Sequence, residues 1–572
     1  MWHKNDTKLA QVVFADNHTA AFGTENCRRM RRHIFSELSP IAGDLAAHYI
    51  KTAERTNFEQ ANHELQDIYN QLRIEDLNLC ADHEELLNAA RRYAEKCYLA
   101  RNRAKSPSEA YQACLRIVDH YQVKRPSIKG DKLEPALNRM CCHHWWFRRI
   151  KILRLRKIET IARNIELVSR LRGTYASDFT IHAKRKQKER NSLYLATNFV
   201  SNQNGDIFSL QNLADRSVSN PAIRRAELMT RIRGFEMVAD HLGHVGEFYT
   251  VTTPSRMHAC LHHGVTNPRY DGTSVLQAHE YLIHIWSLIR AELHRQGIQP
   301  YGFRVVEPHH DGTPHWHLLL FMPEKHREAV RKVMRHYALL DNGNEPGAQE
   351  RRFKAEAIDP AKGTAVGYIA KYISKNIDGF ALDQDLYGND AAKAAERITA
   401  WANTWGIRQF QQIGGPSVTV WRQLRKLDKS DDPELEAIRQ FATACDWAAF
   451  MLAMGNPEAA HRSHAIKPFY DESKRLNPMN GEVYSPATGR YGDSAPLRVS
   501  GILWKGSSYS TRKHVWMLFK VDSEDVTLRS EAQAERTQCH AGAVSLGLGL
   551  VSITVPTPFQ PQKINYENPT QH

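Results

Sequence analysis

The chain has 572 residues, of which 42% are hydrophobic and 24% are charged, which is ordinary for a soluble globular protein. Its formal net charge of +14 favours a polyanionic partner, nucleic acid first and an anionic membrane second. The nine cysteines are odd in number, scattered and without a CxxC pair, so a disulfide framework is excluded and reduced thiols are expected. At roughly 100–200 residues per domain, the length predicts about three domains.

The sequence predicts no membrane segment. The start, Met1–Asp6, is not followed by an apolar run, so we expect no signal peptide. The most apolar stretch, Ala541–Val555, is too short to span a bilayer and is interrupted by glycine and serine. We therefore expect a cytoplasmic protein with no membrane partner.

Residues 1–190 predict a mainly helical region that could bind DNA. Leucine, alanine, glutamate and arginine run through His63–Arg103 with few helix breakers. Arg148–Ile158 is basic and amphipathic, which fits either a helix with a solvated basic face or a helix that contacts phosphates. The basic run Lys184–Arg190 predicts a linker that could also contact the DNA backbone. The Cys141–His144 cluster predicts a buried helix segment, because adjacent side chains point apart.

Residues 191–430 predict an α+β domain, and 431–572 a C-terminal region. Strand-like runs occur at Phe248–Thr252, Phe303–Glu307 and His315–Phe321, and helical segments at Val275–Arg295 and Glu324–Leu340. This order indicates an antiparallel sheet with flanking helices. Beyond about residue 555, a tail rich in proline, glutamine and asparagine predicts disorder.

Two histidines at alternate positions, His315 and His317, predict a metal-binding face on one strand. Successive side chains of a strand point to opposite faces, so Trp316, Leu318 and Leu320 point away from the histidines and can enter a core. Imidazole is the commonest metal ligand among side chains, and two imidazoles on one strand face can bind one ion.

The segment before these histidines offers a carboxylate. Asp311-Gly312 is a hairpin turn signal. A strict two-residue loop would put Glu307 opposite Trp316, on the wrong face. A three-residue or bulged loop would put it opposite His315 or His317, and we expect this longer loop. One carboxylate and two imidazoles suit Mg²⁺ or Mn²⁺ acting on a phosphate, although imidazole binds Zn²⁺ more tightly.

Other metal families with the same histidine pair do not fit. A nucleotide hydrolase of the histidine-triad type requires a histidine where this chain has Leu319. A metallo-β-lactamase-type site requires Asp-His where the chain has Leu319 and Leu320. We expect His309 and His310 to be loop or DNA-contact residues, although either imidazole could serve as an alternative metal ligand.

A second element is the segment Gly363–Ile377, which predicts an amphipathic helix. At about 100° per residue, one apolar stripe contains Val366, Ile369, Ala370, Ile373 and Ile377. The opposite side contains Tyr368, Lys371, Tyr372 and Lys375. Two tyrosines one turn apart beside two lysines indicate nucleophiles, because nearby cations favour the phenolate. Lys371 and Lys375 could also hold a phosphate. An exposed basic face is the alternative.

These motifs together resemble the HUH endonuclease superfamily, in its rolling-circle replication branch. His315-Trp316-His317 is followed by Tyr368-x-x-Lys371-Tyr372-x-x-Lys375. More closely, the chain resembles the replication gene A proteins of tailed temperate phages. The flanking segments Arg304–His309, Gly406–Phe410 and Gly414–Ser417 share this resemblance, and Phe248–Thr252 resembles the family's first motif, a core strand.

The resemblance implies a mechanism. Tyr368 and Tyr372 would be nucleophiles, and His315, His317 and Glu307 would bind a divalent ion, Mg²⁺ or Mn²⁺. The protein would nick one strand at a replication origin, leaving a 5′-phosphotyrosine and a free 3′-OH, and would later reseal the displaced strand. Its partners would be single-stranded origin DNA and the helicase and polymerase of a bacterial host, since the chain has no GxxxxGK[ST] loop.

Two rival functions remain open at this level. A single-strand transposase also combines the histidine pair with downstream tyrosines. A non-catalytic origin-binding protein would keep its function after Tyr→Phe changes. A relaxase is disfavoured, because in relaxases the tyrosine precedes the histidines.

Overall fold

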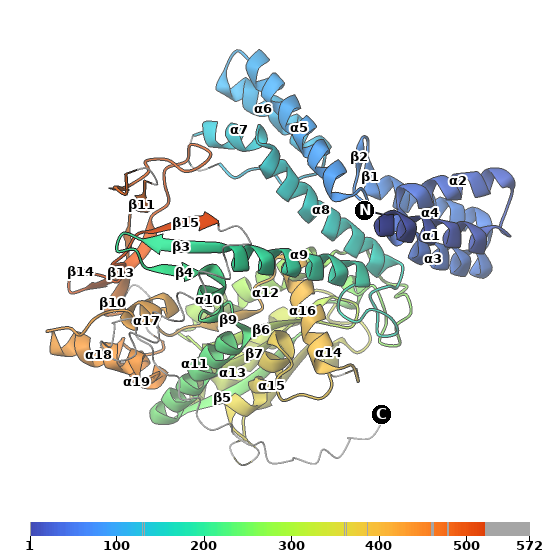
Figure 1. Ribbon diagram of the computed structural model, residues 1–572. Coiled ribbons are helices and arrows are strands. Elements are labelled where there is room, and N and C mark those ends of the chain that lie inside the picture. Colours follow the sequence, from blue (N-terminus) through green and yellow to red (C-terminus); the bar gives the residue numbers. More distant parts are fainter. Residues whose placement is uncertain are drawn as a thin grey trace.

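The computed structural model describes residues 2–520 except 129, 131, 360, 362, 386, 459–462, 478 and 479. The described part is α+β, as predicted: a helical N-terminal region projects from a body built around a five-stranded antiparallel sheet (Figure 1). The expected tail beyond 555 and the apolar stretch 541–555 lie outside the described residues. Among the helices described here, none combines the length and apolar composition needed to cross a membrane.

The N-terminal region contains helices around one hydrophobic core, which extends from Ala15 to Ile165. The elements are α1 (Trp2–Thr19), α2 (Glu25–Glu37), η1 (Ser39–Ile41), α3 (Ala42–Arg55), α4 (Phe58–Leu72), β1 (Arg73–Ile74), β2 (Leu77–Asn78), α5 (His83–Arg103), α6 (Pro107–His120), α7 (Glu134–Met140) and α8 (His143–Asn164). The helical run expected over His63–Arg103 is interrupted by the β1–β2 hairpin. After the hairpin, helix α5 begins at a capping box formed by Asp82 and Glu85.

The basic run 184–190 is not a linker, and that prediction is wrong. It lies inside α9 (Asp178–Thr197), which begins where the Ser177 hydroxyl accepts a hydrogen bond from the backbone N–H of Thr180. Lysine, arginine, glutamine and glutamate are good helix formers, and the run has no glycine or proline to end the helix. Helix α8, which contains Arg148–Ile158, connects the N-terminal core with the body (Figure 1).

The central sheet has the strand order β8-β5-β7-β6-β9 and is antiparallel throughout. Its strands are β5 (His244–Val251), β6 (Tyr301–Pro308), β7 (Pro314–Pro323), β8 (Phe353–Ala357) and β9 (Phe410–Ile413). The three predicted strands are β5, β6 and β7, and the predicted helix Val275–Arg295 is α12. The second predicted helix is shorter than expected, as α13 (Arg327–Ala338) after η3 (Glu324–His326).

Helices cover both faces of the sheet. The face that carries Leu319 and Phe321 packs against α11 (Pro221–Leu242) and α15 (Ala365–Ile377). The opposite face, with Trp316, Leu318 and Leu320, shares a core with α12, α13 and α16 (Ala391–Trp405). The alternation read from the sequence is therefore confirmed: we call the first the metal face and the second the opposite face.

The core of the metal face continues past residue 430, so the boundary expected there is not a break in packing. Trp447, Phe450, Ile502 and Trp504 belong to the same core as Leu319. The elements outside the central sheet are β3 (Asn198–Asn202), β4 (Ile207–Ser209), α10 (Leu210–Asp215), η2 (Ser255–Met257), α14 (Ala348–Arg351), α17 (Val418–Leu424), α18 (Pro433–Thr443), α19 (Trp447–Ala453), β10 (Ile466–Asp471), β11 (Arg475–Leu476), β12 (Val483–Tyr484), β13 (Arg498–Trp504), β14 (Ser507–Ser510) and β15 (Trp516–Lys520). Strand β15 pairs with β3, which ties the C-terminal segment back to the region after α9.

Candidate metal centre and tyrosine helix

The β6–β7 hairpin has the longer loop that the sequence predicts. The His309 N–H donates to the Thr313 carbonyl over 2.7 Å, and the Gly312 N–H donates to the His309 carbonyl over 2.9 Å. Gly312 has a φ of +79°, the left-handed conformation that commonly closes a three-residue hairpin loop. The resulting register puts Glu307 opposite His315, on the metal face as expected.

Glu307, His315 and His317 form one buried cluster. Their ligand atoms all lie within 4.8 Å of one another, and among the described residues this is the one such group of histidine, cysteine or acidic side chains. The Nε2 atoms of the two histidines are 2.9 Å apart, and Glu307 Oε2 is 3.9 Å from His317 Nε2. Two nitrogens at right angles around an ion at about 2.1 Å would be about 3.0 Å apart, so the donor set fits a small divalent ion.

Neighbouring side chains orient these ligands. Thr250 Oγ1 is 3.0 Å from His317 Nδ1, so this hydrogen bond turns Nε2 toward the cluster. The Lys375 ammonium donates to Glu307 Oε2 over 3.0 Å, and the Asn376 amide donates to Oε1. Glu307 is fully buried, and these two donors compensate its charge.

Burial also sets the protonation of the histidines. It lowers the pKa of His317 to about 4, an effect that the Glu307 charge opposes and the Lys375 charge reinforces. Burial also lowers the pKa of His315 well below its usual range, and the neighbouring His309 and His317 act in the same direction. Both imidazoles are therefore neutral at pH 7, which is the form that binds a metal.

Helix α15 brings one tyrosine beside the cluster. The helix begins where the Thr364 hydroxyl accepts a hydrogen bond from the Gly367 N–H over 3.1 Å. Ile369 and Ile373 are buried in the metal-face core, as the wheel predicts. The Tyr372 ring centroid is 4.2 Å from that of His317. Burial raises the pKa of Tyr372, and the Glu307 and Glu356 charges raise it further, so the phenol is protonated at pH 7.

The other members of the polar stripe have different surroundings. Tyr368, one turn before Tyr372, is half-buried, and its side chain forms no hydrogen bond or ring contact with another residue in the described part of the chain. Lys371 is exposed, with its ammonium 5.2 Å from the centre of the Tyr372 ring. Lys375 is buried against Glu307, a contact that the helical wheel does not reveal.

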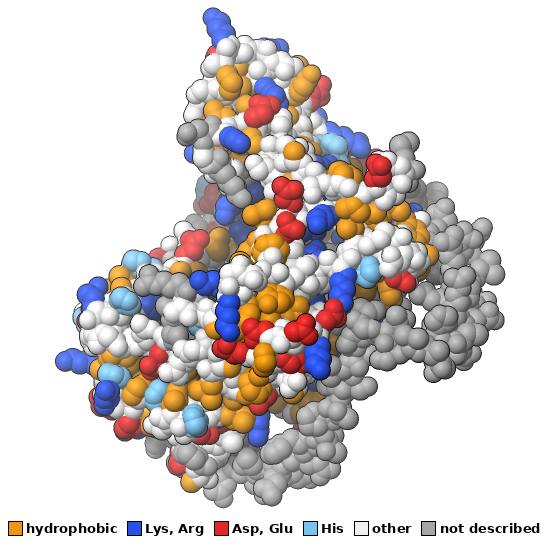
Figure 2. Space-filling model, turned by 90° about the vertical axis from the view of Figure 1, so that its left-hand side faces the viewer, with side chains coloured by type: hydrophobic (Ala, Val, Ile, Leu, Met, Phe, Trp, Pro, Cys, Tyr) orange, Lys and Arg blue, Asp and Glu red, His pale blue; other side chains and the backbone are white. Residues whose placement is uncertain are grey.

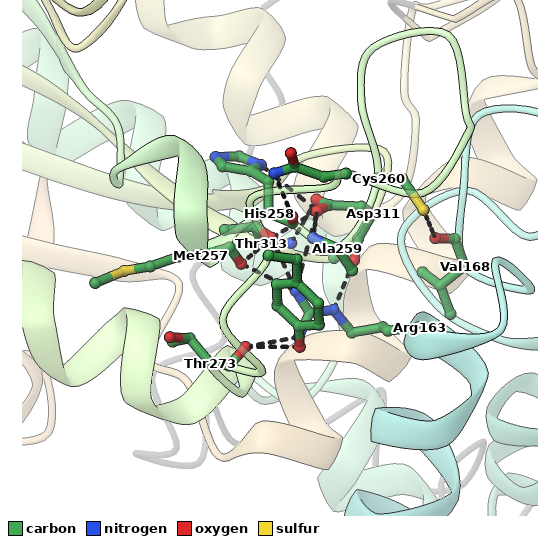
Figure 3. Close-up of polar contacts among 12 residues, drawn as sticks. Arg163, Val168, Met257, His258, Ala259, Cys260, Thr273, Asp311 and Thr313 are labelled. Carbon is green, nitrogen blue, oxygen red and sulfur yellow. Dashed lines mark hydrogen bonds and ion pairs between the residues drawn. The ribbon is translucent and has the colours of Figure 1, made fainter. Parts of the chain in front are cut away.

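A buried ion pair links the hairpin loop to helix α8. The Arg163 guanidinium donates to the Asp311 carbonyl over 2.8 Å and to the Thr313 hydroxyl over 3.0 Å. It also contacts the carbonyls of Thr273 and Met257, so one side chain joins three loops (Figure 3). Arg163 and Asp311 are both at most 1% exposed. The N-terminal region thus supports the loop that precedes the histidines.

Asp311 organises the same loop from its other side. Its carboxylate accepts hydrogen bonds from the Ala259 N–H over 2.8 Å and from the Thr313 hydroxyl over 2.8 Å (Figure 3). Burial would raise the pKa of Asp311, but the adjacent His258 and the Arg163 charge outweigh burial and hold this pKa well below its usual range.

His309 and His310 lie behind the cluster instead of projecting to solvent. The His309 ring centroid is 4.1 Å from that of His315 and 5.0 Å from that of His258, and His310 is 5% exposed. Both are loop residues, as expected, and His309 is half-buried whereas His310 is buried.

Sequence reasoning missed several supporting residues. Asn376 lies in the predicted helix Gly363–Ile377, next to its polar side. For Asp311 the sequence indicates only a turn residue. Thr250 lies in the predicted first strand, and its partner could be named only from the register of β5 against β7, in which Thr250 is opposite His317. For Arg163 and His258 the sequence carries no local signal, since their partners are more than 50 residues away.

Comparison with known proteins shows the family of this chain. The sequence profile of the bacteriophage replication gene A protein family matches residues 60–380. This range includes the β6–β7 hairpin and all of α15. The chain belongs to this family. The match begins in α4, so it also includes much of the N-terminal helical region. No solved structure matches the chain.

Relatives in the family carry related names. The chain is 42% identical over 392 residues to the replication gene A protein of Escherichia phage 186, covering 66% of this chain and 56% of the relative. It is 34% identical over 398 residues to a probable replication endonuclease from a prophage-like region of Salmonella paratyphi A, covering 66% and 48%. It is 33% identical over 469 residues to the replication protein of Haemophilus phage HP1, covering 77% and 58%. The chain spans about half the length of the curated relatives it matches.

Proposed function

We propose that this chain is a metal-dependent endonuclease that nicks one strand of a replication origin and initiates rolling-circle phage DNA replication. The observation that carries the proposal is the position of Tyr372, with its ring 4.2 Å from that of His317 at the edge of a buried Glu/His/His cluster. The family membership and the relatives named replication endonuclease support it.

His315, His317 and Glu307 would hold the divalent ion, Mg²⁺ or Mn²⁺. When bound, the ion supplies Lewis-acid stabilisation of charge on the scissile phosphate. Lys375 and Asn376 keep the Glu307 carboxylate in place and charge-compensated. Their contribution is to the geometry of the ligand set, whereas Lys371 is exposed and free to approach a phosphate of the DNA.

In the chemical step, the Tyr372 or Tyr368 oxygen attacks the phosphorus in line. The phenolic proton is released, the bond between phosphorus and the 3′-oxygen breaks, and that oxygen takes up a proton. The products are a 5′-phosphotyrosine and a free 3′-OH. Because burial keeps Tyr372 protonated in the free protein, the tyrosine becomes nucleophilic only as positive charge is gathered around the phosphate.

The second tyrosine gives the protein a way to finish replication. Residues four apart on a helix share one side, so Tyr368 and Tyr372 can act in turn at one metal site. After a round of copying, the second tyrosine attacks the regenerated origin, and the displaced 3′-OH reseals the first strand. The 3′-OH would be extended by a host polymerase and the duplex opened by a host helicase in the bacterial cytoplasm.

The test is formation of a protein–DNA adduct on single-stranded origin DNA with Mg²⁺ or Mn²⁺, seen on a denaturing gel. Wild type should form the adduct, EDTA should abolish it, and the double variant Tyr368→Phe/Tyr372→Phe should form none. Tyr98→Phe, which changes an exposed tyrosine of α5, is the matched control and should behave as wild type. If wild type binds the origin and forms no adduct, the chain is an origin-binding protein and the endonuclease proposal is wrong.

A further inference from the structure

Arg304, on the opposite face of the sheet from the metal cluster, is a buried cation without an anionic partner. It lies on β6, opposite Leu318 in the register, and is 5% exposed. Its guanidinium carbon lies 4.0 Å from the centre of the Trp316 ring. Its Nε atom is buried and has no hydrogen-bond partner, and no described carboxylate pairs with the guanidinium.

This arrangement is costly unless something compensates it. Removing a guanidinium from water without a counter-charge costs more than one stack on an indole ring recovers. Arg163, another of the buried arginines of this fold, shows the usual solution, because it donates to carbonyls and to a hydroxyl and lies beside a carboxylate. Arg304 has no equivalent set.

The surroundings of Arg304 add positive charge. Arg408, just before β9, and Arg290, on α12, are exposed, and neither forms an ion pair with a described residue. Burial, followed by the charges of Arg408 and Arg290, lowers the pKa of Arg304 to about 10. The adjacent His279 is buried with an unpartnered Nδ1 and stays neutral, because burial and then the Arg304 charge lower its pKa to about 4.

We propose that Arg304, together with Arg408 at the adjoining end of β9, binds a phosphate group on the opposite face of the sheet. A guanidinium presents paired N–H donors that match two oxygens of one phosphate, and a buried guanidinium binds such an anion more strongly than an exposed one. The phosphate comes either from a DNA strand that passes around the β9 edge or from a free phosphate or nucleotide. The DNA source rests on the proposed function, whereas the site itself does not.

The first experiment measures thermal stability of the full chain in sodium phosphate and in sodium chloride at matched ionic strength. Phosphate should raise the Tm of wild type and should not raise that of Arg304→Gln or Arg408→Gln. Arg233→Gln removes the same charge from an exposed arginine of α11 and should keep the phosphate effect. Because Arg408 is exposed, its variant keeps the test decisive if Arg304→Gln fails to fold.

The second experiment identifies the source of the phosphate. Binding of a single-stranded oligonucleotide is measured by fluorescence anisotropy over a range of salt concentrations, with all proteins carrying Tyr368→Phe and Tyr372→Phe. If a DNA strand supplies the phosphate, Arg304→Gln and Arg408→Gln should each weaken binding about three- to tenfold and reduce the salt slope by roughly 0.7. Unchanged DNA binding with an arginine-dependent phosphate effect would support the site with a free phosphate or nucleotide as its ligand.

The proposal is overturned if phosphate stabilises Arg304→Gln as much as wild type and if both arginine variants bind DNA like Arg233→Gln. Adduct formation by the tyrosine-intact protein is scored separately. Adduct formation combined with arginine variants that match Arg233→Gln in both experiments would reject this site alone. An arginine-dependent phosphate effect with no adduct would reject the endonuclease alone.

Discussion

The β6–β7 hairpin and helix α15 both contribute to the candidate site, but they are held in different ways. The hairpin lies in the middle of the sheet, with β5 and β9 beside its two strands, and its ligands are at most 7% exposed. Helix α15 is anchored by an isoleucine stripe, while Lys371 on its other side is exposed. A metal site benefits from ligands that are fixed before the ion binds, whereas a nucleophile that acts in turn with a second one needs access to solvent and DNA.

The largest effect should come from removing a ligand. We expect His317→Ala to reduce Mn²⁺ affinity by more than about 100-fold, since even residues that only orient ligands contribute about 10–100-fold. Tyr372→Phe keeps the ring next to His317 and removes its hydroxyl. It should leave Mn²⁺ affinity within about threefold of wild type while preventing attack by that residue. Calorimetric titration with Mn²⁺ separates the two. Equal losses in both variants would mean that the helix, and not the hairpin alone, forms the metal site.

The buried ion pair behind the hairpin should matter most for stability. Arg163→Ala removes a buried cation that helps to compensate the Asp311 charge and leaves the buried carbonyl of Asp311 without its donor, so we expect a loss of about 3–5 kcal/mol in the free energy of unfolding, measured with urea. Arg185→Ala breaks an exposed pair with Glu396 and should change stability by less than about 1 kcal/mol. Comparable values for the two variants would show that α8 does not support the hairpin loop.

The two lysines of α15 give a sharper comparison. Lys375→Met removes the donor to Glu307 and should weaken Mn²⁺ binding by about 10–100-fold. Lys371→Met, one turn earlier and exposed, should leave Mn²⁺ affinity unchanged and slow adduct formation on DNA. The reverse result would place the phosphate contact at Lys375, which the helical wheel puts on the same side of the helix as Lys371.

The smallest effect concerns the loop glycine. Gly312→Ala forces alanine into a φ of +79° and places its Cβ 3.2 Å from the Tyr175 carbonyl oxygen. Gly347 has the same φ, but the nearest atom to its Cβ would be 3.6 Å away. Both variants should lose about 1 kcal/mol of stability from backbone strain. Only Gly312→Ala should also weaken Mn²⁺ binding, and equal behaviour would show that the contact with Tyr175 has no consequence for the site.

The outer surface shows a further contrast with the site. On the face in Figure 2, lysine and arginine side chains are interspersed with aspartate and glutamate. The formal charge of +14 is therefore not gathered into one patch on the part of this face that the structure describes. The position of an individual buried arginine, such as Arg304 beside Trp316, indicates an anion site more specifically than the net charge of the chain does.

The sequence alone predicted the features that depend on local periodicity. Alternation over residues 315–321 assigned the two faces of β7, and the 3.6-residue period assigned the two sides of α15, because these patterns arise from backbone geometry within one element. The Asp311-Gly312 signal predicted a hairpin, and its expected loop length placed Glu307 correctly. Local reasoning failed at 184–190, where charge was taken as a sign of a linker although the residues favour a helix.

Only the tertiary structure decided which side chains support these elements. The pairs Arg163 with Asp311, Thr250 with His317, and Lys375 with Glu307 join residues 67 or more positions apart. Such contacts depend on how helices pack on the sheet and on strand order, which no periodicity within a single element encodes. The sequence thus determined the candidate ligands and the orientation of each element, and the packing of distant segments determined how those side chains are held and how they are charged.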